Sequence, residues 1–243
     1  MKNILIAIIA GLAIVISTVV LANAVKNRNI DDGVISVTGL GKTDFVSDLI
    51  VWEGSFRNER MDLQQAYSEL EKDRNLITDY LKSKGLTEDE FVFTAVNSYK
   101  NVRPIFSDEG RQIGEEFTGY NLSQTVEIKS KDVEKIEKVS REITELLNQG
   151  VQFYSNPPRY YYTKLADVKI EMISQATADA RLRAEKIAEN AGAELGDLIS
   201  AKMGVFQITG QNSNEEFSWG GTYNVESKDK TASITMKLSY EVD

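Results

Sequence analysis

The spacing of hydrophobic residues changes several times along this chain, and this change constrains the fold more than any other feature. In residues 45–57, alternate positions are apolar, which is the period of a half-buried β-strand. In residues 63–85 the apolar side chains recur at helical spacing until Gly85, a residue typical of helix ends. A chain that alternates runs of strands with single helices is predicted to have a mixed fold.

The same criteria predict elements along the rest of the chain. A second helix begins at Asp132 as its N-cap and ends at Gly150. A third and longer helix covers residues 165–192. Further strands are predicted over residues 33–41, 91–103, 116–129, 151–162, 198–209 and 231–242. The order ββα–ββα–βα–ββ predicts an α+β fold: a mainly antiparallel sheet with three inserted helices, after one N-terminal hydrophobic helix.

The first 25 residues are dominated by an uncharged apolar run, residues 4–21. As a helix this run would be roughly 27 Å long, close to the thickness of a bilayer core. Its length favours an uncleaved signal-anchor, whereas Ala22-Asn23-Ala24 is typical of a signal-peptide cleavage site. Both interpretations stay open. If uncleaved, residues 4–24 would contact the lipid bilayer; residues 26–32 are a short linker, and residues 33–243 form one folded domain.

We expect this domain to lie outside the cytoplasm, in the cell envelope, because an N-terminal segment of this kind directs the export of the domain behind it. The chain has no Cys and no His. These absences exclude disulfides and thiolate nucleophiles, and they remove the side chain most used for acid–base catalysis near neutral pH. The formal charge of −9 disfavours binding to nucleic acid. We predict no catalytic residues, no cofactor and no metal.

One short motif imitates a nucleotide site. Residues 36–43 end in Gly41-Lys42-Thr43 like a P-loop, but Ser36 stands where the first glycine of a P-loop is required. The residues after this motif have strand character, so no helix N-terminus would face a phosphate. We therefore predict no nucleotide binding and interpret residues 39–41 as a turn between two antiparallel strands.

Three stretches resemble the SIMPL-domain family, a domain of unknown function. They are residues 35–41 (Ile-Ser-Val-Thr-Gly-Leu-Gly), residues 118–126, and residues 165–196, which are the most specific. Within the third stretch the matching positions are Ala176, Asp179, Ala180, Arg181, Ala184, Glu185, Ala188, Gly192, Leu195 and Gly196. The resemblance covers residues 33–242. It implies a bacterial periplasmic or surface-associated protein that forms homo-oligomers, and it supplies no catalytic residues to transfer.

A possible interface is predicted from small and aromatic side chains. The third helix carries an alanine stripe that packs either inside one chain or against a second subunit. Arg181 flanks this stripe and is expected to form solvated or rim ion pairs. Tyr161, within three consecutive tyrosines, and Trp219, within a Gly-rich loop, are candidates for exposed contacts. The candidate interface residues are Ala176, Ala180, Arg181, Ala184, Tyr161 and Trp219.

The leading functional hypothesis is a non-enzymatic envelope protein whose principal partner is a second copy of itself. A first alternative is a binding module for an envelope protein or polymer that uses Phe217, Trp219 and Tyr223. A distant alternative is a hydrolase that uses two carboxylates or a Ser–Lys pair, and a deeply buried Lys beside a Ser would favour it.

Overall fold

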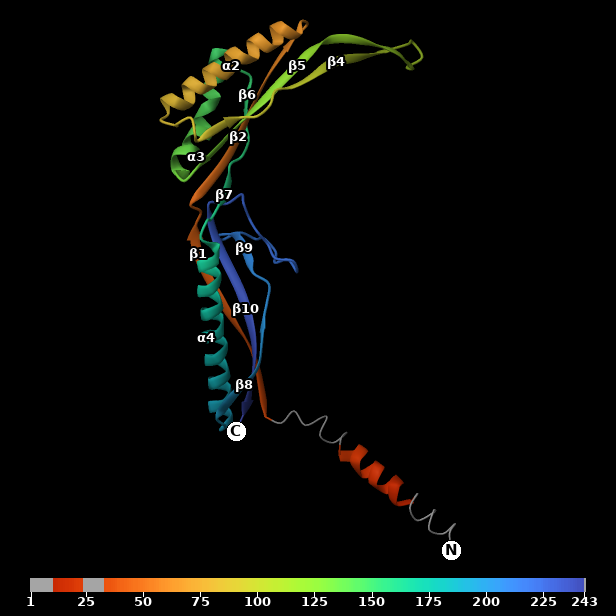
Figure 1. The fold of residues 1–243 in the computed structure, drawn as a ribbon, viewed down its shortest axis with the longest axis vertical. Helices are drawn as coiled ribbons and strands as arrows, with labels where there is room; N and C mark the ends of the chain where they lie inside the picture. Colours follow the sequence, from red (N-terminus) through yellow and green to blue (C-terminus); the bar gives the residue numbers. More distant parts are fainter. Residues whose placement is uncertain (1–10, 24–32, 243) are drawn as a thin grey trace. The chain divides into compact units, whose positions relative to one another are not determined.

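The computed structural model describes residues 11–23 and 33–242, which include a helix over residues 11–23 (Figure 1). None of the described helices is both long and apolar enough to cross a membrane. The expected apolar segment begins within residues 1–10, and its cleavage site reaches residue 24. The predictions for that segment and for the linker therefore lie partly outside the described residues.

Contacts between Cα atoms divide the chain into two compact units. Unit 1 contains residues 173–204 and 234–243 together with the chain up to Gly41; unit 2 contains residues 42–172 and 205–233. The described elements are mixed helices and antiparallel strands, as the sequence predicts. Strands β1 (Val34–Val46) and β10 (Asp229–Val242) and helix α4 (Leu165–Ala191) each contribute residues to both units.

Unit 2 is built on a sheet whose central strands are β2 (Leu49–Arg60) and β5 (Gln112–Ser130). These two strands pair antiparallel from Ile50 opposite Ser130 to Arg60 opposite Tyr120. Strands β3 (Phe91–Phe93) and β4 (Asn97–Phe106) pair with β5, and strands β6 (Phe153–Ser155) and β7 (Arg159–Tyr161) pair with β2. Side chains alternate between the two faces of such strands, which lets one face form a core.

Helices α2 (Leu63–Ser83) and α3 (Val133–Glu142), the latter continued by a 3-10 turn η1 (Ile143–Gln149), contact β2 and β5 (Figure 1). Asp62 and Asp132 cap the two helices, accepting hydrogen bonds from the backbone N–H groups of Gln65 and Lys135. The apolar stripes of the helices meet alternate residues of the strands in one core, which includes Ile50, Trp52, Phe56, Leu70, Ile77, Val126, Ile128, Ile136 and Leu146.

In unit 1, α4 packs its small side chains against β1, while β8 (Leu195–Met203) pairs antiparallel with residues 236–242 of β10. Gly39 explains how close the helix comes. A Cβ added at Gly39 would lie 2.1 Å from the backbone oxygen of Ala176 and 2.7 Å from the Cβ of Ala180. Glycine on the strand and alanine on the helix are therefore required together.

The prediction of a turn at residues 39–41 is wrong. Gly39, Gly41 and Lys42 all lie inside β1, which continues to Val46. Neither glycine has a positive φ, and the reason for Gly39 is the approach of α4 described above. Because the Gly-Lys-Thr motif lies in a continuous strand, it has no phosphate-binding loop around it.

Strands β4 and β5 extend as a two-stranded hairpin past the other strands of their sheet (Figure 1). We call residues 97–118 the arm. It consists of β4, a turn, and the first seven residues of β5, which pair only with β4. No side chain of the arm is buried. From Tyr120 onward β5 joins the core, so one strand has two very different halves.

Candidate functional site: an aromatic loop on a polar frame

The connection between β9 (Gln207–Gly210) and β10 carries the most exposed aromatic side chains of unit 2. We call residues 211–228 the aromatic loop. Trp219 is fully exposed, Phe217 is 68% exposed and Tyr223 is 47% exposed. Such side chains provide contact area at low conformational cost when a rigid backbone presents them. How well these side chains are presented therefore depends on the contacts that fix the backbone of the loop.

Gln207, on β9, holds the tip of the aromatic loop. Its buried side-chain amide donates a hydrogen bond to the carbonyl oxygen of Ser218 at 2.8 Å. Its amide oxygen accepts from the N–H groups of Ser218, at 3.3 Å, and Thr222, at 2.8 Å. Gly221 closes the turn that carries Trp219 by donating its N–H to Ser218 at 3.1 Å, with a φ of 92° that favours glycine.

Lys230, the second residue of β10, holds the C-terminal end of the loop. Its side chain is only 1% exposed. The ammonium donates hydrogen bonds to the backbone oxygens of Asn224, at 2.8 Å, and Ser227, at 2.5 Å, and to Asn224 Oδ1 at 3.3 Å. Three donors thus meet three oxygens, which satisfies the full hydrogen-bonding capacity of the group.

A carboxylate completes this polar frame. Glu215 accepts one hydrogen bond from the N–H of Gly210 at 2.9 Å and another from the side-chain amide of Asn224. The side chain of Asn224 therefore links the two charged groups: its Oδ1 accepts a hydrogen bond from Lys230, and its Nδ2 donates one to Glu215. Burial lowers the pKa of Lys230 to about 8, while the charge of Glu215 acts in the opposite direction. We call the buried Gln207, Asn224 and Lys230, together with the exposed Glu215, the polar frame.

The arrangement favours binding. The polar groups of the frame point into hydrogen bonds with the loop itself, whereas the aromatic side chains remain exposed to solvent. A loop fixed in this way loses little conformational entropy when a partner covers it. Aromatic residues are also enriched in the interfaces of protein complexes.

The alanine stripe of α4 lies inside the chain. Ala176, Ala180 and Ala184 have no exposed surface, and the first two face Gly39 of β1. Of the two interpretations of this stripe, packing within one chain describes these three residues. In this conformation these three side chains present no surface to solvent.

The other predicted interface residues lie apart from one another in the chain's elements. Arg181 is on the exposed side of α4, where its Nε donates to Glu185 at 2.8 Å, an ion pair of the kind expected from the sequence. Tyr161 is half-buried on β7, opposite Leu49 of β2. Trp219 is the one candidate that is both large and fully exposed. It is also the one that belongs to the aromatic loop.

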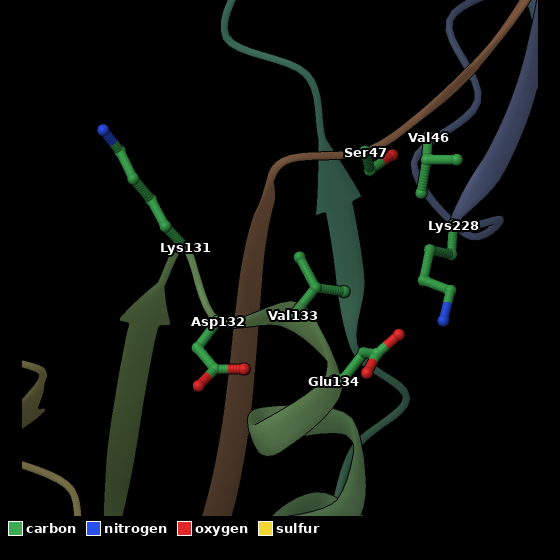
Figure 2. Close-up of a pocket in the computed structure, with 7 residues that line it drawn as sticks. All are labelled: Val46, Ser47, Lys131, Asp132, Val133, Glu134 and Lys228. Atoms are coloured by element: carbon green, nitrogen blue, oxygen red, sulfur yellow. The ribbon is translucent and has the colours of Figure 1, made fainter.

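Unit 2 also has a pocket of about 290 Å³ at the start of α3. Figure 2 shows the residues that line it. Two of the four charged groups around it have structural partners. Asp132 caps α3, and Lys228 donates a hydrogen bond to Glu137 at 3.2 Å. Ser47 is buried, and among the described residues its hydroxyl has no hydrogen-bond partner. The Ser47 hydroxyl therefore makes no hydrogen bond to the acids or lysines that line this pocket.

The buried titratable groups nearby stabilise the fold. Burial, together with a hydrogen bond to Glu137 at 3.0 Å, raises the pKa of Tyr160 to about 12. Burial opposes ionisation of Glu137, but the hydrogen bonds from Tyr160 and Lys228 outweigh it and lower the pKa of this carboxyl. The deeply buried Lys230 contacts the backbone oxygen of Ser227. A Ser–Lys nucleophile would require a contact with the serine hydroxyl instead.

Sequence reasoning identified the aromatic residues of the loop but missed its frame. Gln207 and Lys230 bind mainly backbone atoms, and such bonds leave no periodic pattern in the sequence. The only signal was the polar, Gly-containing composition between two strands, which predicts a loop without indicating what fixes it.

The sequence model of the SIMPL family, described as a protein of unknown function (DUF541), matches residues 35–240 of this chain. This match spans the described residues of both units apart from their ends. No curated protein matches the chain.

Proposed function

This chain belongs to the SIMPL family, and on that premise we propose that it is a non-enzymatic interaction protein of the cell envelope. In this proposal the aromatic loop binds a partner outside the cytoplasm, and the chain also associates with copies of itself. The single observation that carries the proposal is the fully exposed Trp219 on a loop fixed by the buried side chains of Gln207 and Lys230.

The energetic cost of that loop supports a functional role. Burying an ammonium group is costly unless its donors are all satisfied, and Lys230 meets this condition only because the loop folds around it. A connection between two antiparallel strands needs only a few residues, whereas this one has eighteen. Long, ordered loops of this kind commonly carry binding residues.

The absence of enzymatic chemistry is supported by the composition and by the described contacts. The chain contains no His and no Cys, so acid–base or nucleophilic chemistry would depend on carboxylates, Lys, Ser or Tyr. The most perturbed of these groups, Lys230 and Tyr160, are held in hydrogen bonds that stabilise the loop and α3. Among the described residues, no three carboxylates gather as a metal-binding group.

The envelope location is supported by the apolar run of residues 4–21 and the Ala22-Asn23-Ala24 site. Either fate of this segment delivers the domain across the membrane: as a tethered protein, with the segment in the bilayer, or as a released one. Mass spectrometry of the chain recovered from cell fractions tests this point. A full-length chain in the soluble cytosolic fraction would contradict the location.

Trp219 provides a direct test of binding. The chain has two tryptophans, and the other one, Trp52, is fully buried in the core of unit 2. Quenching of tryptophan emission by acrylamide therefore reports mainly on Trp219. We expect purified cell-wall polymer, which contains no tryptophan, to protect Trp219 from quenching. The Trp219→Phe variant is the matched control, because its remaining tryptophan is already inaccessible.

The second component, self-association, follows from the family resemblance and has its own test. We expect the full chain, kept soluble in a mild detergent because of residues 4–21, to sediment as a species larger than a monomer. A chain that remains monomeric over the whole accessible concentration range would remove self-association from the proposal. Binding through the aromatic loop would be unaffected by that result.

A further inference from the structure

Strand β3 forms part of an open edge of the sheet in unit 2. It pairs with β5 on one side, and no described strand pairs with its other side. Other edge strands of the chain have an outward N–H that is already bonded. On β1, Leu40 donates its N–H to Asp179 at 2.8 Å, and on β7, Tyr160 donates its N–H to the backbone oxygen of Val225 at 2.7 Å. Because open edges invite pairing with another chain, an unoccupied one marks a site for a further strand.

The hydrogen bonds at the two ends of β3 show how its backbone is oriented. Lys129 donates its N–H to the backbone oxygen of Glu90 at 3.0 Å, and Thr94 donates its N–H to that of Thr125 at 2.9 Å. In an antiparallel pair, every second residue exchanges such bonds with the partner strand. Val92 is therefore the residue of β3 whose N–H and C=O face β5.

Phe91 and Phe93 each turn an N–H and a C=O toward the open edge. Among the described residues, these four groups make no hydrogen bond. An extended peptide matches them, because its own backbone supplies donors and acceptors at the same spacing. From Phe93 to Asn97 this edge advances four residues while β5 advances three. The resulting bulge limits the matching segment to about three to five residues.

A pocket of about 390 Å³ lies beside this edge, between β3 and α2. Phe91, Val92 and Phe93 line it from the strand, and Arg74 and Thr78 line it from the helix. Side chains of an added strand would alternate between the two faces of the sheet, so every second one would face this pocket. Main-chain bonds would then provide the affinity and the pocket the specificity. We call this pocket and the open edge of β3 the β3 groove.

Charge complementarity indicates one side chain of the segment. Two charged residues line the pocket, and one of them, Glu88, is already paired with Lys82 at 2.6 Å. The other is Arg74, whose Cζ lies 4.9 Å from the centre of the Phe93 ring and which makes no ion pair among the described residues. A guanidinium stacked on a ring keeps its N–H donors available for a carboxylate.

We propose that the β3 groove binds an extended segment of a partner protein. The segment adds to β3 as a further strand, through the outward N–H and C=O groups of Phe91 and Phe93, and places one Asp or Glu side chain on Arg74. This site lies outside the aromatic loop, and its occupation does not depend on the function proposed for that loop.

The probe for this site comes from a phage-displayed library of random heptapeptides, selected on the full chain in mild detergent. We expect the enriched peptides to contain β-branched or aromatic residues at alternate positions and one Asp or Glu, without proline between them. The most enriched peptide is then synthesised twice, once with its acid and once with the matching amide. A selection that enriches no common sequence would overturn the proposal.

Amide hydrogen exchange, measured by NMR, locates the bound peptide. In the chain alone, the outward amides of Phe91 and Phe93 should exchange fast, whereas the amide of Val92 should exchange slowly. The peptide should slow exchange at the two phenylalanines at least tenfold. Val92 is the internal control, because its N–H faces β5 with or without the peptide. Unchanged exchange at both phenylalanines with the peptide bound would show that it binds elsewhere, against the proposal.

The carboxylate contact is tested by the anisotropy of the labelled peptides. Arg74→Gln should weaken binding of the acidic peptide about fivefold and leave binding of the amide peptide unchanged. Lys72→Gln is the matched control, because Lys72 is an exposed cation of α2 that does not line the pocket. Equal losses in the two variants, or equal binding of the two peptides by the unmodified chain, would contradict the role of Arg74.

The outcomes also separate this site from the proposed function. A peptide that protects Trp219 from quenching, without slowing exchange at Phe91 and Phe93, would bind the aromatic loop and overturn the β3 groove as its site. A peptide that slows exchange at the two phenylalanines and leaves the quenching of Trp219 unchanged would support the β3 groove, whatever the aromatic loop binds.

Discussion

The aromatic loop and the arm both expose aromatic side chains, but the chain supports them in opposite ways. Beneath the loop lie buried polar groups, of which Lys230 alone makes three hydrogen bonds. Beneath the arm there is no buried side chain at all. The loop is therefore organised by buried side chains of the chain itself, whereas the arm is held mainly by the pairing of its two strands. Substitutions in the two regions test this difference.

Replacing Lys230 by Met should have the largest effect. The three oxygens that accept hydrogen bonds from the ammonium would remain buried without donors, which should cost about 3–4 kcal/mol of the free energy of unfolding. Urea denaturation measures this loss. Lys237→Met, an exposed position on the same strand, is the control and should stay within about 0.5 kcal/mol. Similar losses in both variants would show that the frame does not depend on Lys230.

The pH dependence of stability should reveal the same lysine. Because burial lowers its pKa to about 8 from 10.5, the unfolded chain binds the proton more tightly than the folded chain between these values. The contribution of Lys230 to the free energy of unfolding is therefore constant below pH 8. It rises by at most about 3 kcal/mol as the pH increases from 8 to 10.5. The difference between the denaturation curves of the unmodified chain and Lys230→Met isolates this contribution. A difference that falls with rising pH would contradict the account.

Truncating Gln207 to Ala should cost about 1–2 kcal/mol, because it removes three hydrogen bonds that hold the turn around Trp219. The fluorescence anisotropy of Trp219 should fall as the turn becomes more mobile. Gln112→Ala in the arm is the matched control, since that glutamine is exposed and lies over no core. If the two substitutions lowered the free energy of unfolding by the same small amount, the loop would be no better supported than the arm.

The smallest effect is expected in the arm itself. Phe106→Ser should change the free energy of unfolding of the dissociated chain by less than about 0.5 kcal/mol, because the side chain is already 59% exposed. Hydrogen exchange should be faster in residues 102–118 than in residues 120–130 of the same hairpin, which contribute to the core. Slow exchange throughout the arm in a monomeric sample would contradict this difference.

Much of the fold follows from local sequence signals. Asp132 caps α3 as predicted, and Gly85 and Gly150 end their helices with positive φ values of 79° and 87°. These signals succeed because a cap or a left-handed glycine depends on a few neighbouring residues. The predicted turn at Gly39 failed because its cause is remote: the approach of α4, more than 130 positions along the chain.

The candidate site was only half predictable for the same reason. Trp219 was identified from a Gly-rich aromatic stretch, but Lys230 gives no sign in the sequence that it is buried. The arm was predicted as two strands and a loop, and alternation cannot tell whether a face is covered. The alanine stripe shows the converse: its spacing predicts burial but cannot distinguish the chain's own strand from a second subunit.

The most direct test of partner binding by the loop is acrylamide quenching of Trp219 in the purified chain, measured with and without purified cell-wall polymer. We predict that Trp219 is readily quenched in the chain alone and protected when the polymer is added, while Trp52 is inaccessible in both samples. Equal quenching of Trp219 in the two samples, with the chain folded in both, would contradict binding of the polymer by this loop.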